Sequence, residues 1–245
     1  MPFTFSHPAI ILPLNYLPKK WFSLTGLIIG SLTPDFEYFI RMKVQSNYSH
    51  TFAGIFWFDL PLAILIAFLY HNIVRDNLSN NLPKFLRERI QIFNEFNWNS
   101  YFKNNTVVVL ISILIGISSH LFWDSFTHEH GYFINRIALL KETVTFINQK
   151  IPVFKIAQHL STFIGGIIIV IALFKLPTNK TSNFPSNKKY WLVLTLMTFT
   201  IVSLRILCGL NYNLYGHLIV TFISAILISL ILTPVLIKST TFTSH

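Results

Sequence analysis

Charge is scarce in this chain of 245 residues. Asp, Glu, Lys and Arg together make up 11% of the sequence, whereas soluble domains contain roughly 25% charged residues. Apolar residues make up 52% of the chain, and the mean hydropathy is +0.54. So few charged side chains are not enough to cover a surface that faces water. We therefore expect an integral membrane protein, and the alternative is a very apolar soluble helical bundle.

Several other features are missing as well. The sequence has one cysteine, Cys208, so no disulfide can form within the chain. It contains no internal repeat, no Gly-rich phosphate loop and no Ser-His-Asp arrangement. The net charge of +10 is not accompanied by any nucleic-acid-binding motif. We therefore expect membrane lipid as a partner and no nucleic acid.

Long apolar runs account for the composition. A helix needs about 20 mostly apolar residues to span a bilayer. Five runs approach or exceed this length, and a sixth, weaker run is interrupted by Pro34 and Asp35. The five runs are residues 53–70, 106–123, 160–176, 190–210 and 214–237, and the weaker one is 21–40. The pattern predicts an all-α, polytopic membrane bundle of five or six transmembrane helices.

The runs also suggest how the chain is organised. We expect one membrane domain over residues 1–245, with polar candidates for a site confined to residues 1–176. Residues 177–189 are rich in Asn, Ser, Thr, Lys and Pro and are typical of a linker. Residues 190–245 then add two transmembrane helices.

Basic residues predict the orientation in the membrane. With six spans, twelve Lys and Arg residues fall on one side and six on the other, which places both termini in the cytoplasm and the protein in the cytoplasmic (inner) membrane. The first lysines are Lys19 and Lys20, so no removable signal peptide is expected. On this topology the site candidates lie toward the outer side, except His7, unless residues 3–17 fold back into the membrane.

A run rich in histidine and carboxylate follows directly on an apolar run. Residues 120–130 contain three histidines and two carboxylates, where charge is costly and usually functional. Residues four apart share one helix face, so His120 and Asp124 can point at one ion, and His128 continues the stripe if the helix persists. Imidazole with carboxylate suits zinc, manganese or iron better than calcium or magnesium.

One helix cannot complete a four-coordinate site, and three further polar residues lie in apolar surroundings: His7, Asp35 and His50. With Thr33 as a cap and Pro34 in the first turn, the sequence predicts a break in the run 21–40. A broken helix at membrane depth is tolerated where it lines a polar cavity. Asp35 is therefore a strong candidate ligand.

Simpler interpretations of the same residues stay open. His120 and Asp124 can form a buried hydrogen-bonded pair that only joins helices, and His50 can be an ordinary loop residue. Glu129 and His130 are interpreted as solvated loop residues. Ion transport or sensing would also place Asp and His inside a membrane.

Three motifs carry a resemblance. The segments Gly30–Phe36 and His120-x-x-Trp123-Asp124-x-x-Thr127-His128, together with the opening Met1-Pro2-Phe3-Thr4-Phe5-Ser6-His7-Pro8-Ala9, closely resemble an uncharacterised family of bacterial membrane proteins. That family is similar to membrane-bound metal-dependent hydrolases and, more distantly, to zinc-dependent phospholipase C. The resemblance extends to about residue 159.

The resemblance implies a helical fold of the phospholipase C and nuclease type for the site-bearing part. It implies that one ion is shared by Asp35, His50, His120 and Asp124. It also implies that Asp124 bridges to a further group of ligands, made up of His7, His128 and His159. The secreted enzymes carry an amino-terminal Trp ligand, and a Glu where this chain has Phe163. We therefore expect one or two ions, zinc in the first place.

These observations predict a membrane-embedded metal-dependent hydrolase of a lipid or other amphiphilic phosphoester, which uses metal-activated water. In this prediction Asp124 bridges or anchors the metal and Asp35 orients the water, so both are catalytic candidates. The alternative is a metal-binding membrane protein without catalysis, with a role in ion transport, sensing or structure.

Overall fold

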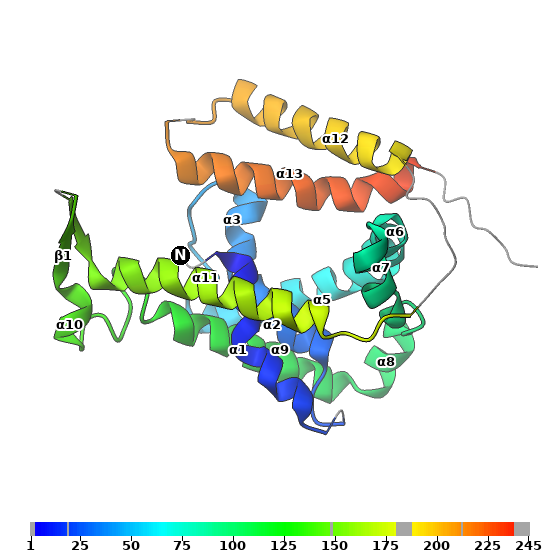
Figure 1. The fold of residues 1–245 in the computed structure, drawn as a ribbon, viewed down its shortest axis with the longest axis horizontal. Coiled ribbons are helices and arrows are strands. Elements are labelled where there is room, and N and C mark those ends of the chain that lie inside the picture. The colour runs from blue at the N-terminus through cyan, green and yellow to red at the C-terminus, as the bar shows by residue number, and fades with distance from the viewer. Residues whose placement is uncertain (1–2, 19, 148, 180–187, 212, 238–245) are drawn as a thin grey trace, which may run out of the picture. The chain divides into compact units, whose positions relative to one another are not determined.

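The computed structural model describes residues 3–18, 20–147, 149–179, 188–211 and 213–237. Within these ranges the chain is mostly helical, as predicted (Figure 1). The exception is a short antiparallel hairpin of β1 (Thr143–Phe146) and β2 (Gln149–Pro152). The predicted linker 177–189 lies largely outside the described residues, since 180–187 are not among them.

Five helices in the described part of the chain are long and apolar enough to cross a membrane. They are Phe52–Asn81, α9 (Thr106–Asp124), α11 (Val153–Phe174), α12 (Lys188–Leu207) and α13 (Tyr215–Leu236). The five strong apolar runs are thereby confirmed as helices. The shorter helices are α7 (Lys84–Ile90), η6 (Gln91–Phe93), α8 (Trp98–Asn104) and α10 (Ala138–Lys141).

The first of these long helices runs further than its apolar run. It consists of α4 (Phe52–Gly54), η4 (Ile55–Asp59), α5 (Leu60–Leu69), η5 (Tyr70–Val74) and α6 (Arg75–Asn81). The helix continues past residue 70 and includes the buried Arg75, whose charge is satisfied within the fold. Its guanidinium donates to Asp76 at 2.7 Å and to the carbonyls of Phe96 and Asn94 at 2.6 and 3.0 Å.

The weaker run 21–40 is broken where the sequence predicted. It forms α2 (Leu24–Leu32), the 3₁₀ turn η3 (Thr33–Asp35) and α3 (Phe36–Arg41). The expected capping role of Thr33 is wrong, because its hydroxyl donates back to the carbonyl of Ile29 at 2.6 Å. The helix tightens at the break instead of ending and restarting. This tightened turn carries Asp35.

The chain divides into two compact units. The first contains residues 1–35, 47–64 and 104–175, and the second contains 36–46, 65–103 and 176–245. This differs from the expected boundary after residue 176, because residues 36–46 and 65–103 group with the two C-terminal helices. In the second unit Thr221 of α13 donates to the carbonyl of Met42 at 3.2 Å, and Trp191 of α12 donates to that of Asn81 at 2.8 Å.

Close packing of α2 on α9 organises the first unit (Figure 1). The contact is made at glycines: a Cβ added at Gly30 would overlap the carbonyl of Ile113, and one at Gly116 would overlap that of Leu27. Small residues let helix backbones approach closely in membranes. The approach places the C-terminal end of α2 beside the last turns of α9, where His120 and Asp124 lie.

The N-terminal segment packs on α11. It forms η1 (Thr4–Ser6), α1 (Pro8–Ile11) and η2 (Leu12–Tyr16). The Ser6 hydroxyl donates to the carbonyl of Thr162 at 2.9 Å, and the backbone N–H of Phe3 donates to the Thr162 hydroxyl at 2.9 Å. His7 lies at the junction between η1 and α1 and is buried.

The second unit is held together by small polar side chains. Its helices α12 and α13 lie side by side (Figure 1), and Thr198 donates to Ser229 across the contact at 3.1 Å. His71 of η5 stacks on Trp98 with ring centroids 4.8 Å apart. No residue of the predicted site belongs to this unit.

Candidate metal centre

Four of the predicted ligands converge in the first unit. Asp35, His50, His120 and Asp124 each offer one ligand atom, and these atoms all lie within 4.8 Å of one another. Asp35 comes from η3, His50 from the segment before α4, and His120 and Asp124 from the end of α9. Chain segments up to 89 residues apart thus meet at one point.

The spacing of these atoms suits an ion better than a set of hydrogen bonds. Nε2 of His120 lies 3.3 Å from Oδ2 of Asp124 and 3.5 Å from Oδ1 of Asp35. Nε2 of His50 lies 3.5 and 4.0 Å from the same two oxygens. Hydrogen bonds between charged N–H groups and carboxylates are about 2.7–2.9 Å long. Ligands about 2.1 Å from one tetrahedral zinc ion would lie about 3.4 Å apart.

The polar atoms of these side chains that face away from the cluster contact neighbouring groups. Nδ1 of His120 donates to the carbonyl of Ser31 at 2.7 Å, so that Nδ1 carries the proton and Nε2 faces the cluster. The Thr4 hydroxyl donates to Oδ2 of Asp35 at 2.6 Å, and Ser49 Oγ lies 3.0 Å from Nδ1 of His50. Such outer contacts orient metal ligands and fix their tautomers.

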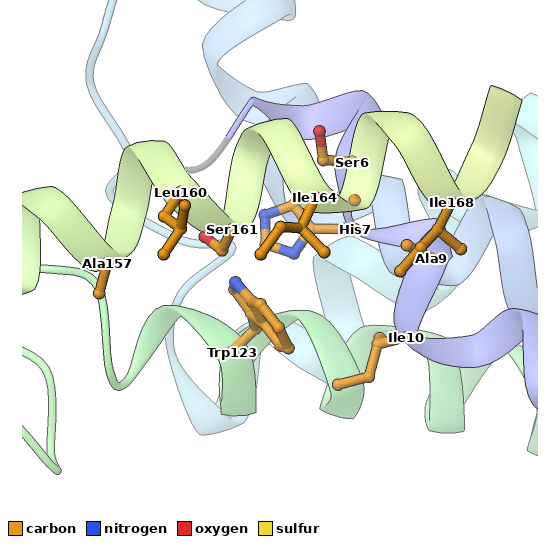
Figure 2. A pocket seen from close by; sticks show the side chains of 11 residues that line it. Ser6, His7, Ala9, Ile10, Trp123, Ala157, Leu160, Ser161, Ile164 and Ile168 are labelled. Carbon is orange, nitrogen blue, oxygen red and sulfur yellow. The ribbon is translucent and has the colours of Figure 1, made fainter.

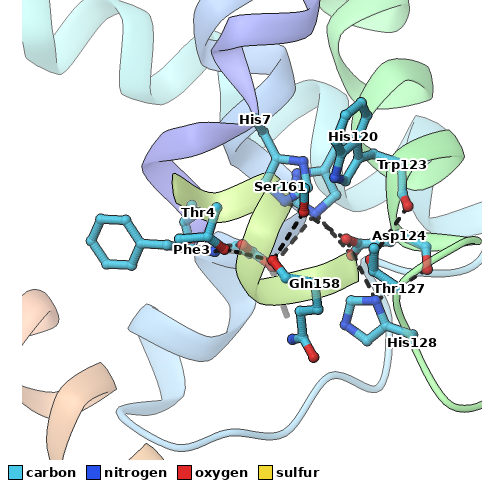
Figure 3. A network of polar contacts seen from close by, with 12 residues as sticks. Phe3, Thr4, His7, His120, Trp123, Asp124, Thr127, His128, Gln158 and Ser161 are labelled. Carbon is cyan, nitrogen blue, oxygen red and sulfur yellow. Dashed lines mark hydrogen bonds and ion pairs between the residues drawn. The ribbon is translucent and has the colours of Figure 1, made fainter. Parts of the chain in front are cut away.

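A second group forms around the other oxygen of Asp124. Oδ1 of Asp124 lies 3.6 Å from Nε2 of His7 and 3.5 Å from Nδ1 of His128. Nδ1 of His128 also donates to the backbone carbonyl of Asp124 at 3.2 Å, so the ring nitrogen of His128 without a hydrogen bond is Nε2. Figure 3 shows these three side chains pointing toward one another. The ring of His7 also stacks on that of His120, with centroids 3.7 Å apart. Asp124 therefore stands between two sets of histidines.

His128 reaches the centre even though α9 ends at Asp124. The chain continues in a turn in which the backbone N–H of His128 donates to the carbonyl of Asp124 at 3.0 Å. This bond preserves the four-residue spacing of a helix. His128 therefore lies close to Asp124 although the helix itself stops, and its role as a metal ligand stays a prediction.

The donor set fits a divalent cation. Within the described part of the chain, buried Oδ1 of Asp35, Nε2 of His120 and both carboxylate oxygens of Asp124 make no hydrogen bond. Two buried carboxylates are costly unless a positive charge compensates them. Burial, together with the neighbouring His120, lowers the pKa of His7 to about 4. The neutral imidazole that results is the form that binds metal.

The centre opens to the surroundings on one side. The side chains of Asp35 and His120 are 0% exposed, whereas those of His50 and His128 are 24% and 30% exposed. Burial also lowers the pKa of His128. The partly exposed side of the centre is therefore formed by His50 and His128, whose Nε2 atoms are themselves buried.

A model of a family described as a domain of unknown function, DUF4184, matches residues 1–235. The chain belongs to this family. Neither a curated protein nor a solved structure matches it. Since the family description states no activity, the role of this DUF4184 chain has to be argued from the centre itself.

One predicted ligand is not brought to the centre. His159 lies on an exposed face of α11, while its neighbour Gln158 is buried. Successive helix positions point about 100° apart, so the resemblance that implied His159 selects a residue on the wrong face of this helix. Glu129 and His130 are exposed, as interpreted from the sequence.

Sequence reasoning missed the groups that orient the ligands in the DUF4184 chain. Thr4 and Ser49 are ordinary polar residues, and the carbonyl of Ser31 has no sequence signal at all. The hydrogen bond from Thr4 also concerns the predicted role of Asp35, which was to orient the water. With Oδ2 accepting from Thr4 and Oδ1 facing the histidines, Asp35 is placed as a ligand, and its role in orienting water stays a prediction.

Proposed function

We propose that this chain is a membrane-embedded metal-dependent hydrolase that cleaves a phosphoester of a lipid or other amphiphile with water. The observation that carries the proposal is the position of Asp124, whose two carboxylate oxygens face two separate sets of histidine nitrogens. A carboxylate in this position can bridge two ions. Paired ions about 3.5–4 Å apart suit the cleavage of phosphoesters.

The residues divide naturally between two ions. Asp35, His50 and His120 with Oδ2 of Asp124 would hold one, and His7 and His128 with Oδ1 of Asp124 would hold the other. A divalent ion bound there supplies Lewis acidity and lowers the pKa of a bound water. The mixture of imidazole and carboxylate favours zinc, with manganese and iron as alternatives.

Two further observations support a lipid-like substrate. The centre is built partly on α9, one of the five helices apolar enough to cross a membrane. The chain's motifs also resemble those of membrane-bound metal-dependent hydrolases and, more distantly, zinc-dependent phospholipase C. Analogy of fold alone is a weak argument for function, so the substrate class rests on the membrane setting as well.

Metal analysis of the detergent-purified protein tests the centre. We expect one or two ions per chain, and loss of bound metal in His120→Ala and Asp124→Asn. The matched controls are His130→Ala and Glu129→Gln, which change the same residue type or charge at exposed positions close by. Absence of stoichiometric metal after supplementation with zinc, manganese or iron would contradict the proposal.

Hydrolysis is tested on the same samples with a panel of phosphoesters. We expect Asp124→Asn to lower kcat/KM by at least about 100-fold, since even outer contacts of a metal site contribute about 10–100-fold. Bound metal without hydrolysis of any ester would instead favour ion transport or sensing. Absence of metal, with Asp124→Asn loosening the fold equally in metal-loaded and metal-free samples, would favour a purely structural cluster.

A further inference from the structure

A cavity of about 330 Å³ borders the metal centre on the side of His7. Its walls come from α1, α9 and α11 (Figure 2). Apart from Ser6, His7 and Ser161, the lining is apolar or aromatic. The main contributors are Ala9, Ile10, Trp123, Leu160, Ile164 and Ile168.

The cavity and the centre share one side chain. The ring of His7 lines the cavity, and its Nε2 atom lies 3.6 Å from Oδ1 of Asp124. A molecule that touches His7 from the cavity therefore lies next to the second group of ligands.

The helices that form the cavity walls are also apolar on their outward faces. Its walls include α9 and α11, both long and apolar enough to cross a membrane. Ile167 and Ile171 of α11 do not line the cavity and are 44% and 49% exposed, so α11 forms a wall whose other face is apolar and points outward. In a bilayer such a wall faces hydrocarbon, and a lipid chain can reach the cavity without crossing water.

We infer that this cavity binds one hydrocarbon tail of an amphiphile whose phosphoester head lies at the metal centre. The inference rests on the proposed function and narrows its substrate class. Ligand cavities range from about 300 to 1,000 Å³, and this one lies at the small end, which suits a single slender chain.

A photoreactive alkyl phosphonate tests the inference without any need for hydrolysis, because its C–P bond is not a phosphoester. The phosphonate carries a diazirine along its chain and is added to the purified, metal-loaded protein. We expect labelling at Ile10, Trp123 and the inner face of α11, and competition by the same phosphonate without the diazirine. Peptide mass spectrometry identifies the labelled positions.

Ile164→Trp and Ile167→Trp form a matched pair on α11. Both isoleucines are about half exposed, but only Ile164 lines the cavity. The larger Trp side chain at position 164 occupies part of the cavity, so Ile164→Trp is expected to lower competed labelling by about tenfold, equivalent to about 1.4 kcal/mol, while Ile167→Trp leaves it unchanged. Retained metal content in both variants shows that the fold is intact.

Two outcomes would overturn the inference. One is labelling spread evenly over the outward positions of α11, such as Ile167 and Ile171, without competition, which means contact with bulk lipid only. The other is equal labelling of the two variants. Specific labelling without hydrolysis of any ester would contradict the proposed function alone, whereas hydrolysis with unspecific labelling would contradict the tail site alone.

Discussion

At the scale of single residues, Asp124 and Asp35 carry most of the centre. Each is buried, and each carboxylate group has its two oxygens in different surroundings. Both oxygens of Asp124 face histidines, whereas Asp35 has one oxygen on the centre and the other on Thr4. The hydroxyl of Thr4 therefore decides which oxygen of Asp35 is presented to a metal.

Removal of that hydroxyl should weaken metal binding. We expect Thr4→Val, which keeps the shape of the side chain, to reduce metal affinity by about 10–100-fold, as is usual for contacts that orient a ligand. Thr4→Ser should restore most of the affinity, because it keeps the donor. Competition with a chelator measures both variants, and equal affinity of Thr4→Val and the parent protein would show that Thr4 does not orient Asp35.

At the scale of elements, the centre depends on two close helix contacts. The glycines between α2 and α9 bring Asp35 to His120, and the contact of η1 with α11 holds His7 in place. At the second contact a Cβ added to Gly165 would lie 2.9 Å from both Cβ and the carbonyl oxygen of Ser6, whereas one added to Gly166 would meet nothing within 4 Å. These adjacent glycines provide a direct test.

Gly165→Ala should displace η1 from α11, and Gly166→Ala should not. Alanine gains up to about 1 kcal/mol over glycine in a helix, but overpacking costs about 1–3 kcal/mol. We therefore expect a lower Tm in detergent for Gly165→Ala, with loss of the metal held through His7. The control Gly166→Ala should have an equal or higher Tm. Equal behaviour of the two variants would contradict this account of the contact.

At the scale of the whole molecule, the orientation in the membrane is a prediction from charge. Five crossings would leave the residues before the first span and after the last on opposite sides. The expected cytoplasmic position of both termini requires the broken segment of α2, η3 and α3 to cross as well. The charge bias also places the loop after α6 in the cytoplasm and the loop after α9 outside.

Cysteine labelling in a Cys208→Ser background measures this orientation. Ser100 and Glu129 are exposed and flank α9. We expect Glu129→Cys to react with a membrane-impermeant maleimide in intact cells, and Ser100→Cys to react only after permeabilisation. The reverse pattern would invert the topology, and labelling of both positions in intact cells would show that α9 does not cross the membrane.

Much of the fold follows from patterns that are local in the sequence. Runs of about 20 apolar residues predict the long helices because only a helix satisfies its own backbone in lipid. The break at Pro34 and the pairing of His120 with Asp124 follow from proline chemistry and from the helix repeat. The bounds of the helices were harder to predict, since a buried cation such as Arg75 extends a helix when distant carbonyls accept its hydrogen bonds.

The sequence by itself determined that the chain is helical and apolar, and that its rare Asp and His residues are ligand candidates. Only the tertiary structure decided which of them meet. It grouped His7 and His50 with α9 and left His159 on an exposed helix face, because the approach of helices depends on contacts between residues far apart in the chain. The roles of Thr4 and the Ser31 carbonyl, and the cavity beside His7, arise from the same contacts.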